Sequence, residues 1–123
     1  MSKMRYFMFS ILLCGFANLR AVDYATEIQP IFNDHCTNCH NSSHFTGLDL
    51  TSYASVMSGS NNGPVITAGN HSSSLLWQKI NDEEMPPSGD GLSPSNKNSI
   101  AEWIDSGAIL EIFFSSYCKS ISN

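Results

Sequence analysis

The stretch "HCTNCH", residues 35–40, holds the most specific pattern in the chain. Two cysteines, Cys36 and Cys39, stand three positions apart, and His40 follows at once. These residue types suit three kinds of site: a structural zinc ion, a redox-active pair of thiols, or covalent attachment of haem. The rest of the sequence has to discriminate between them.

The spacing Cys-x-x-Cys-His is the attachment signature of c-type haem. Two thiols at this spacing can reach the two vinyl groups of the porphyrin and form thioethers, and the next histidine can ligate the iron. A structural zinc site needs about four ligands. The chain has no second pair at a suitable spacing, although Cys118 with His44 or His71 could be recruited. A redox dithiol would need a βαβ context, and the helix expected before the motif does not supply one.

The first 21 residues have the layout of a secretory signal peptide. Basic residues precede an apolar run over about residues 6–16, and small residues then allow cleavage after Ala17 or Ala21. The apolar run is shorter than the roughly 20 residues of a membrane span, so membrane attachment is expected only if the segment stays uncleaved. We therefore expect an exported, periplasmic protein, which also suits covalent haem attachment.

Loss of residues 1–21 would make the chain strongly acidic. Three of the six basic residues would go and all eleven acidic residues would stay, so the net charge would change from −5 to −8. Nucleic-acid binding is disfavoured, because a phosphate backbone requires a basic face. An acidic surface instead favours a partner with a basic docking face.

Four segments carry helical signals and are joined by long polar loops. They are residues 23–32, 51–57, 72–80 and 94–106. Pro30 is expected to end or kink the first helix near Gln29. The last segment is the clearest, because Ser93 can cap it, a proline takes its first position and Gly107 can end it.

The apolar residues of the first and last segments predict a core in which these two helices cross. The expected members are Ile28, Phe32, Ile100, Trp103 and Ile104. A domain this small with so much irregular chain has little apolar packing of its own, so a central apolar cofactor would help. The residues expected to line its pocket are Leu48, Leu50, Val65, Ile66, Leu75 and Leu76.

Electron-transfer haems often take a methionine as the second axial ligand. Met57 and Met85 are the candidates beyond the signal segment. Met57 has core spacing from Tyr53 on an expected helix, whereas Met85 stands in the polar stretch "EEMPPSGDG" and is followed by two prolines. We therefore predict Met85 as the distal ligand, with His44 or His71 as alternatives.

Residues from about 23 to 109 resemble the single-haem class I cytochrome c domain, most closely its planctomycete-type branch. The pieces that carry the resemblance are "IQPIF…HCTNCH", "GLDLTSYASVMSG", "GPVITAGNHSSSLLWQKI" and "MPPSGDGLSPSNKNSIAEWIDSGA". The resemblance implies a small all-α fold with about four short helices and long loops around one covalently bound haem c. We accordingly assign residues 22–109 to the cytochrome c domain and residues 110–123 to a tail of unknown role.

Carried over residue by residue, the resemblance implies thioether links at Cys36 and Cys39, with His40 as the proximal and Met85 as the distal iron ligand. The sequence departs from the family pattern after the motif. Many class I cytochromes place Gly or Pro soon after the histidine and orient it with a proline carbonyl, but "CHNSSHF" has neither residue. The acceptor for His40 Nδ1 therefore stays open.

With both axial positions filled, the expected function is outer-sphere electron transfer to a redox partner rather than catalysis, by a separate carrier or by the cytochrome module of a larger redox assembly. The alternatives are a haem-based sensor with a labile Met85, or a haem-free interaction domain stabilised by zinc. No arginine remains after residue 21, so the expected partners of the haem propionates are Tyr53, Trp77 and Lys79.

Overall fold

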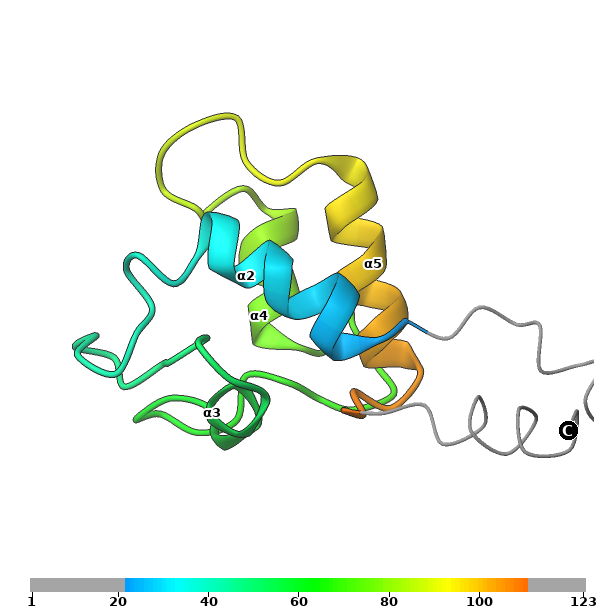
Figure 1. Ribbon diagram of the computed structural model, residues 1–123, viewed down its shortest axis with the longest axis horizontal. Helices are drawn as coiled ribbons and strands as arrows, with labels where there is room; N and C mark the ends of the chain where they lie inside the picture. The colour runs from blue at the N-terminus through cyan, green and yellow to red at the C-terminus, as the bar shows by residue number, and fades with distance from the viewer. Residues whose placement is uncertain (1–21, 111–123) are drawn as a thin grey trace, which may run out of the picture. The chain divides into compact units, whose positions relative to one another are not determined.

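A π-helical turn, η2 (Tyr24–Ile28), begins the part of the chain that the computed structural model describes, residues 22–110. Four α-helices follow: α2 (Gln29–His35), α3 (Tyr53–Ser58), α4 (Leu75–Asn81) and α5 (Pro94–Asp105) (Figure 1). Within residues 22–110 there is no strand, and the isolated bridge between Ser60 and Gly63 is the one β-type pairing described. The predicted all-α fold with four short helices is confirmed.

The predicted signal peptide and most of the predicted tail lie outside the described residues. Of the helices that are described, none combines the length and the apolar character needed to cross a membrane.

Local signals decide where α5 begins and ends. The Ser93 hydroxyl accepts a hydrogen bond from the backbone N–H of Asn96. Pro94 lies in the first turn, where a backbone N–H has no acceptor within the helix, so the missing N–H of proline costs no hydrogen bond. The chain leaves the helix through Gly107, whose φ of 109° suits a residue without Cβ. The prediction for this segment is confirmed to within a residue.

The helix α4 begins at Leu75, within the segment 72–80 predicted to be helical, and Ser74 takes the N-cap position. Ser74 is fully buried, and its hydroxyl donates to the carbonyl of Asn70 while accepting from the N–H of Thr67. The serines before Leu75 therefore belong to a turn that closes the preceding loop, and they do not extend the helix.

Pro30 marks a change of helix type rather than an end. The N–H of Gln29 donates to the carbonyl of Tyr24, which closes the π-helical turn, and Pro30 then falls in the first turn of α2. Because that position needs no N–H donor, α2 continues to His35. Cys36, the first cysteine of the motif, directly follows the last turn of α2, and its N–H donates to the Phe32 carbonyl.

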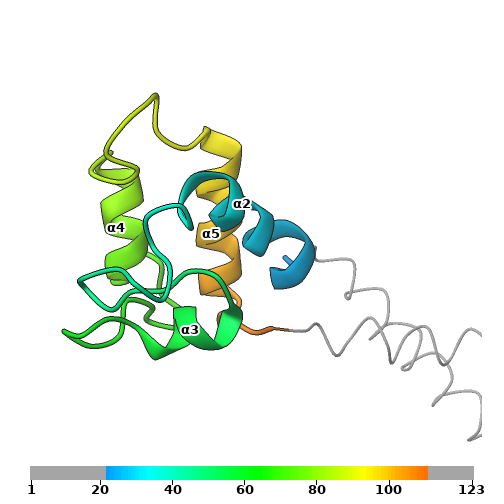
Figure 2. The same ribbon diagram turned by 60° about the vertical axis from the view of Figure 1, so that its left-hand side comes forward.

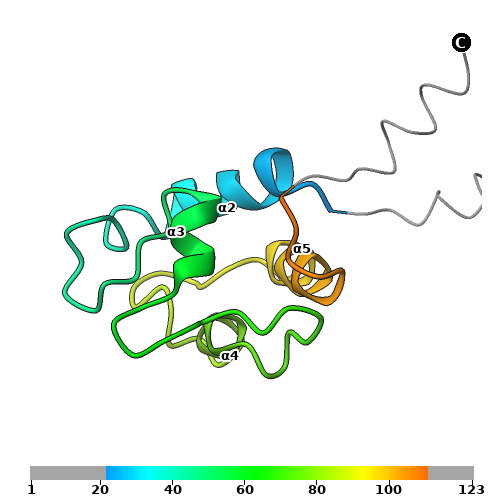
Figure 3. The same cartoon turned by 90° about the horizontal axis from the view of Figure 1, so that it is seen from below.

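The core lies where η2 and α5 pack against each other, and α4 also packs against α5 (Figures 2 and 3). The side chains predicted for this crossing are all fully buried: Ile28, Phe32, Ile100, Trp103 and Ile104. The Tyr24 ring adds to the cluster at 5.1 Å from Trp103, between ring centroids. The predicted helix crossing is confirmed.

Side-chain hydrogen bonds attach the long loops to this core. The Tyr24 hydroxyl donates to Gln29 at 2.6 Å, and the Gln29 amide in turn donates to the Leu50 carbonyl at 3.0 Å. Elsewhere, the Asp105 carboxylate accepts from the backbone N–H of His71 at 2.9 Å and lies 2.8 Å from its Nδ1. The loops are thus fixed by specific bonds, although they contain no regular structure.

Truncation of Ile104 should destabilise the domain strongly. We expect Ile104→Val to cost about 1 kcal/mol and Ile104→Ala about 2–5 kcal/mol, because the side chain is fully buried and the cavity can close only partly. Chemical denaturation followed by circular dichroism measures both values. Glu102→Gln on the exposed side of α5 is the control, and an equal effect there would contradict the assigned core.

The bond between Asp105 and His71 should make stability depend on acidic pH. The hydrogen bond from the His71 backbone N–H lowers the pKa of Asp105 most, and the interactions with the His71 ring lower it further. Desolvation opposes this effect, but the pKa stays below its usual range. A lowered carboxyl pKa contributes stability above about pH 4, and that contribution is lost as the pH falls through the folded-state pKa.

We therefore expect Asp105→Asn to unfold more easily than wild type at pH 6, and this difference to shrink as the pH approaches about 3. Denaturant titrations at several pH values measure it. Asp90→Asn, in an exposed loop, is the matched control. A difference for Asp105→Asn that stays constant with pH would contradict the assignment.

Candidate functional site

An apolar cavity of about 700 Å³ lies beside the cysteine motif. This volume is in the range of cofactor sites. Its walls come from the end of α2, the motif loop and the loop after it, the segment 60–65, α4 and the loop that follows α4. The apolar residues in the lining include Leu48, Leu50, Val65, Leu75, Leu76 and Ile80. Five of the six predicted pocket residues therefore line the cavity, and the prediction is wrong for Ile66, which is buried in the core but does not line the cavity.

The motif forms a tight turn at the end of α2. The carbonyl of Cys36 accepts from the N–H of Cys39 at 3.2 Å and from that of His40 at 2.8 Å. The His40 carbonyl accepts from the Leu50 N–H at 3.0 Å, which fixes the far end of the turn. As a result, both thiols and the imidazole line the same cavity.

Burial keeps the His40 imidazole in its neutral form. Desolvation lowers its pKa first and the nearby His44 lowers it further, while a contact with the Leu48 backbone has the opposite effect. The buried Nδ1 has no partner within hydrogen-bond geometry. A neutral imidazole in an apolar cavity is suited to ligate a metal.

The two cysteines are free thiols with different surroundings. Cys36 is half-buried, and desolvation raises the pKa of its thiol to about 11, whereas Cys39 is exposed. A redox-active dithiol needs a thiolate near neutral pH, so the environment of Cys36 disfavours that interpretation. Within residues 22–110, no three His, Cys, Asp or Glu side chains are arranged to hold a metal ion, and so a zinc site finds no support there.

Met85 lines the cavity together with Cys36, Cys39 and His40. Its N–H and that of Glu84 both donate to the carbonyl of Lys79, at 3.0 Å each. The Lys79 ammonium also pairs with the Glu84 carboxylate. These bonds fix the start of the irregular loop to the end of α4, and they hold Met85 at the cavity.

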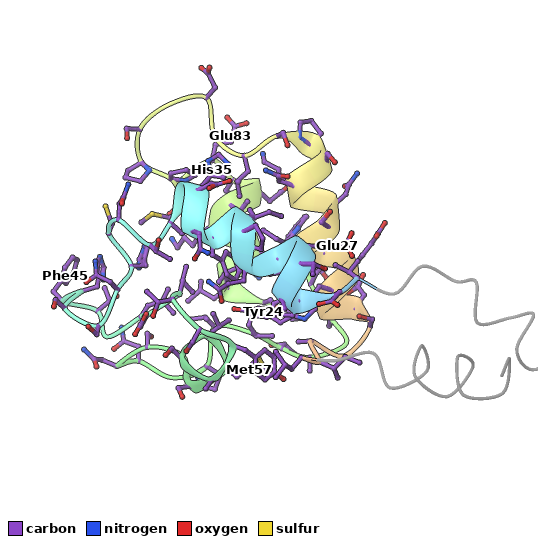
Figure 4. All side chains as sticks on the ribbon, in the orientation of Figure 1. Tyr24, Glu27, His35, Phe45, Met57 and Glu83 are labelled. Carbon is purple, nitrogen blue, oxygen red and sulfur yellow. The ribbon has the colours of Figure 1, made fainter. Side chains whose placement is uncertain are left out.

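Met57 has a different environment. It packs against the core from α3 and does not line the cavity. Figure 4 shows Met57 at the opposite end of the domain from Glu83, which lies two residues before Met85. Of the two methionines considered as ligands, Met85 is the one that shares the cavity with His40.

The three residues expected at the haem propionates lie in different places relative to the cavity. The Tyr53 hydroxyl donates to the Ala108 carbonyl at 2.9 Å, and the Trp77 indole N–H donates to the Lys97 carbonyl at 3.4 Å. Neither residue lines the cavity, whereas Lys79 does. The propionate role stays a prediction for all three, and the polar groups of Tyr53 and Trp77 already have other partners.

His44 and Phe45 are part of the site in a way that sequence reasoning missed. The His44 ring lies against the His40 ring, with centroids 4.2 Å apart, and the Phe45 ring contacts His44 at 4.5 Å. The spacing His-x-x-x-His directly after the motif was the available signal. His71, the other alternative ligand, is bonded to Asp105 and does not line the cavity.

The cavity is open to solvent on one side. Phe45 is 87% exposed and Leu75 is 46% exposed, although both contribute to the lining. Figure 4 shows Phe45 at the outer edge of the loop that follows the motif. A planar cofactor in this cavity would therefore have one edge close to solvent.

The residues present fit a covalently bound haem. Two thiols line an apolar cavity, an imidazole whose neutral form is favoured by burial lies beside them, and a thioether comes from the loop after α4. Each of these groups is a known attachment point or iron ligand of c-type haem.

Comparison with known proteins agrees with this chemistry. Residues 36–89 match the family model described as Planctomycete cytochrome C. The match covers less than half of the 123 residues, but it begins at Cys36 and extends past Met85, so it includes the whole candidate ligand set. No curated protein and no solved structure matches the chain. The comparison thus supports a cytochrome c-type domain of the planctomycete type over residues 36–89.

Proposed function

We propose that this chain is an exported, single-haem c-type cytochrome that carries electrons, with His40 and Met85 as the axial ligands of the iron. One observation supports this most. Met85 stands 45 residues after His40 in the sequence, and yet it lines the same apolar cavity as the imidazole and both motif thiols.

Each of these side chains has a defined task in the proposal. Cys36 and Cys39 hold the haem by thioether bonds, and the haem supplies one-electron chemistry at its iron. His40 presents a neutral nitrogen, since burial disfavours its protonation. The thioether of Met85 and the apolar lining both favour the reduced, less charged iron.

The same arrangement argues for electron transfer over catalysis. Two protein ligands would leave no coordination position for a substrate or for peroxide. The open side of the cavity, at Phe45 and Leu75, would bring the haem edge near the surface. Electrons could then pass to a partner without any bond to the iron.

The partner we propose has a basic docking face. Residues 22–110 contain ten Asp and Glu but only two Lys. Lys79 pairs with Glu84, and Lys97 lies 3.6 Å from Glu83, so both positive charges are already matched by acidic groups. The remaining acidic surface would attract a basic protein over a long range.

Covalent haem can be tested by export expression and the pyridine haemochrome assay. We expect about one haem per chain, and its loss from the chain in the Cys36→Ala, Cys39→Ala double variant, because no thioether can form. Cys118→Ala is the control, as a cysteine outside the motif, and it should retain haem. Wild type without covalent haem would contradict the proposed function.

Met85 ligation can be tested by the methionine-to-iron charge-transfer band of the oxidised protein. We expect the band in wild type, its complete loss in Met85→Ala, and its retention in Met57→Ala, because Met57 packs in the core. A band that survives Met85→Ala would contradict the assigned ligand. A band absent from wild type, together with carbon monoxide binding to the reduced protein, would instead support a haem-based sensor.

A further inference from the structure

We propose that His44 is a positioning residue for the His40 imidazole, and that its ring fixes the plane in which this axial ligand meets the iron. The inference rests on the haem function proposed above. It concerns a residue outside the attachment motif, on the loop that follows it.

The first argument is the contact between the two rings. Their centroids are 4.2 Å apart and their planes are inclined by 39°, so the His44 ring lies against the His40 ring. An axial histidine is normally held by a hydrogen bond from its other ring nitrogen. The buried Nδ1 of His40 has no partner within hydrogen-bond geometry. Beside the contact with the Leu48 backbone, ring packing by His44 is therefore a contact that opposes rotation of the imidazole.

The second argument is that the His44 ring is itself fixed. The Thr46 backbone N–H donates to His44 Nδ1 at 3.3 Å, and the Thr46 hydroxyl lies 2.7 Å from the same nitrogen. Because the N–H can only donate, Nδ1 is the acceptor, and the hydroxyl donates to it as well. Two bonds to one ring nitrogen hold the plane of His44 relative to its own loop.

The third argument is the rigidity of that loop. The Gly47 N–H donates to the His44 carbonyl at 2.9 Å and closes a turn, in which Gly47 has a φ of 72°. Asn61 bonds to the turn from another loop: its backbone N–H donates to the Thr46 carbonyl at 2.8 Å, and its amide donates to the Phe45 carbonyl at 3.2 Å. A Cβ on residue 47 would lie 2.3 Å from the Asn61 amide oxygen, so the turn and Asn61 fit only with glycine there.

A chain of contacts therefore runs from Asn61 through the turn and Thr46 to His44, and from His44 to His40. Each link is a directional hydrogen bond, except the last, which is a ring contact. This arrangement supplies the orientation that a hydrogen bond to His40 Nδ1 would otherwise provide.

The test compares holoprotein variants by spectra that report the orientation of the axial imidazole. These are the electron paramagnetic resonance g-values of the oxidised protein and the spread of its haem-methyl proton shifts. We expect His44→Ala to shift both and to broaden the resonance signal, because the His40 ring gains rotational freedom. His44→Phe keeps a ring of similar size and should restore spectra close to wild type. Thr46→Val keeps the His44 ring but removes the hydroxyl donor, and it should shift the spectra in the direction of His44→Ala.

His71→Ala is the matched control, as a histidine bonded to Asp105 outside the cavity, and its spectra should equal those of wild type. Unchanged spectra in His44→Ala, with haem attached and the charge-transfer band intact, would overturn the inference and leave the proposed function standing. If His44→Ala does not accumulate, Thr46→Val decides by the same spectra, and an unchanged result overturns the inference. Lack of covalent haem in wild type would instead defeat the proposed function itself.

Discussion

The turn from Cys36 to His40 is the constraint around which the domain is arranged. Its two hydrogen bonds to the Cys36 carbonyl bring two thiols and an imidazole to one wall of a cavity. This requires α2 to run without interruption up to the motif, which the position of Pro30 in the first turn of α2 allows. The packing of η2 against α5 then anchors the whole segment in the core.

The other walls of the cavity are built from long loops rather than from helices. Irregular chain of this kind holds its shape only if its backbone groups find partners. The Lys79 carbonyl accepts from two backbone N–H groups of the Met85 loop. The Leu50 N–H donates to the His40 carbonyl, and the Asn61 N–H donates to the Thr46 carbonyl. An apolar cofactor in the cavity would complete the packing that a chain of this length cannot supply by itself.

The sequence predicted the features that depend on local signals. The bounds of α5 followed from Ser93 and Gly107, and most of the cavity lining followed from the apolar pattern. Features that depend on distant contacts were not predictable in this way. The Ser74 hydroxyl, at the N-cap of α4, bonds to the preceding loop and not to the helix. Val65 and Ile66 are both buried in the core, but only Val65 also lines the cavity.

The role of His44 is a further case of the same limit. Its spacing from His40 is visible in the sequence, but its contact with that ring depends on a turn that Asn61 holds from another loop. The partners of Tyr53 and Trp77 are likewise distant carbonyls, at Ala108 and Lys97, which no local pattern indicates.

The central claim is that the cavity holds one haem bound covalently at Cys36 and Cys39. Mass spectrometry of the exported protein tests it most directly, on the intact chain and on the proteolytic peptide that contains residues 36–40. The account predicts a mass increase of one haem per chain, carried entirely by that peptide. A peptide in which both thiols remain free for alkylation would contradict it.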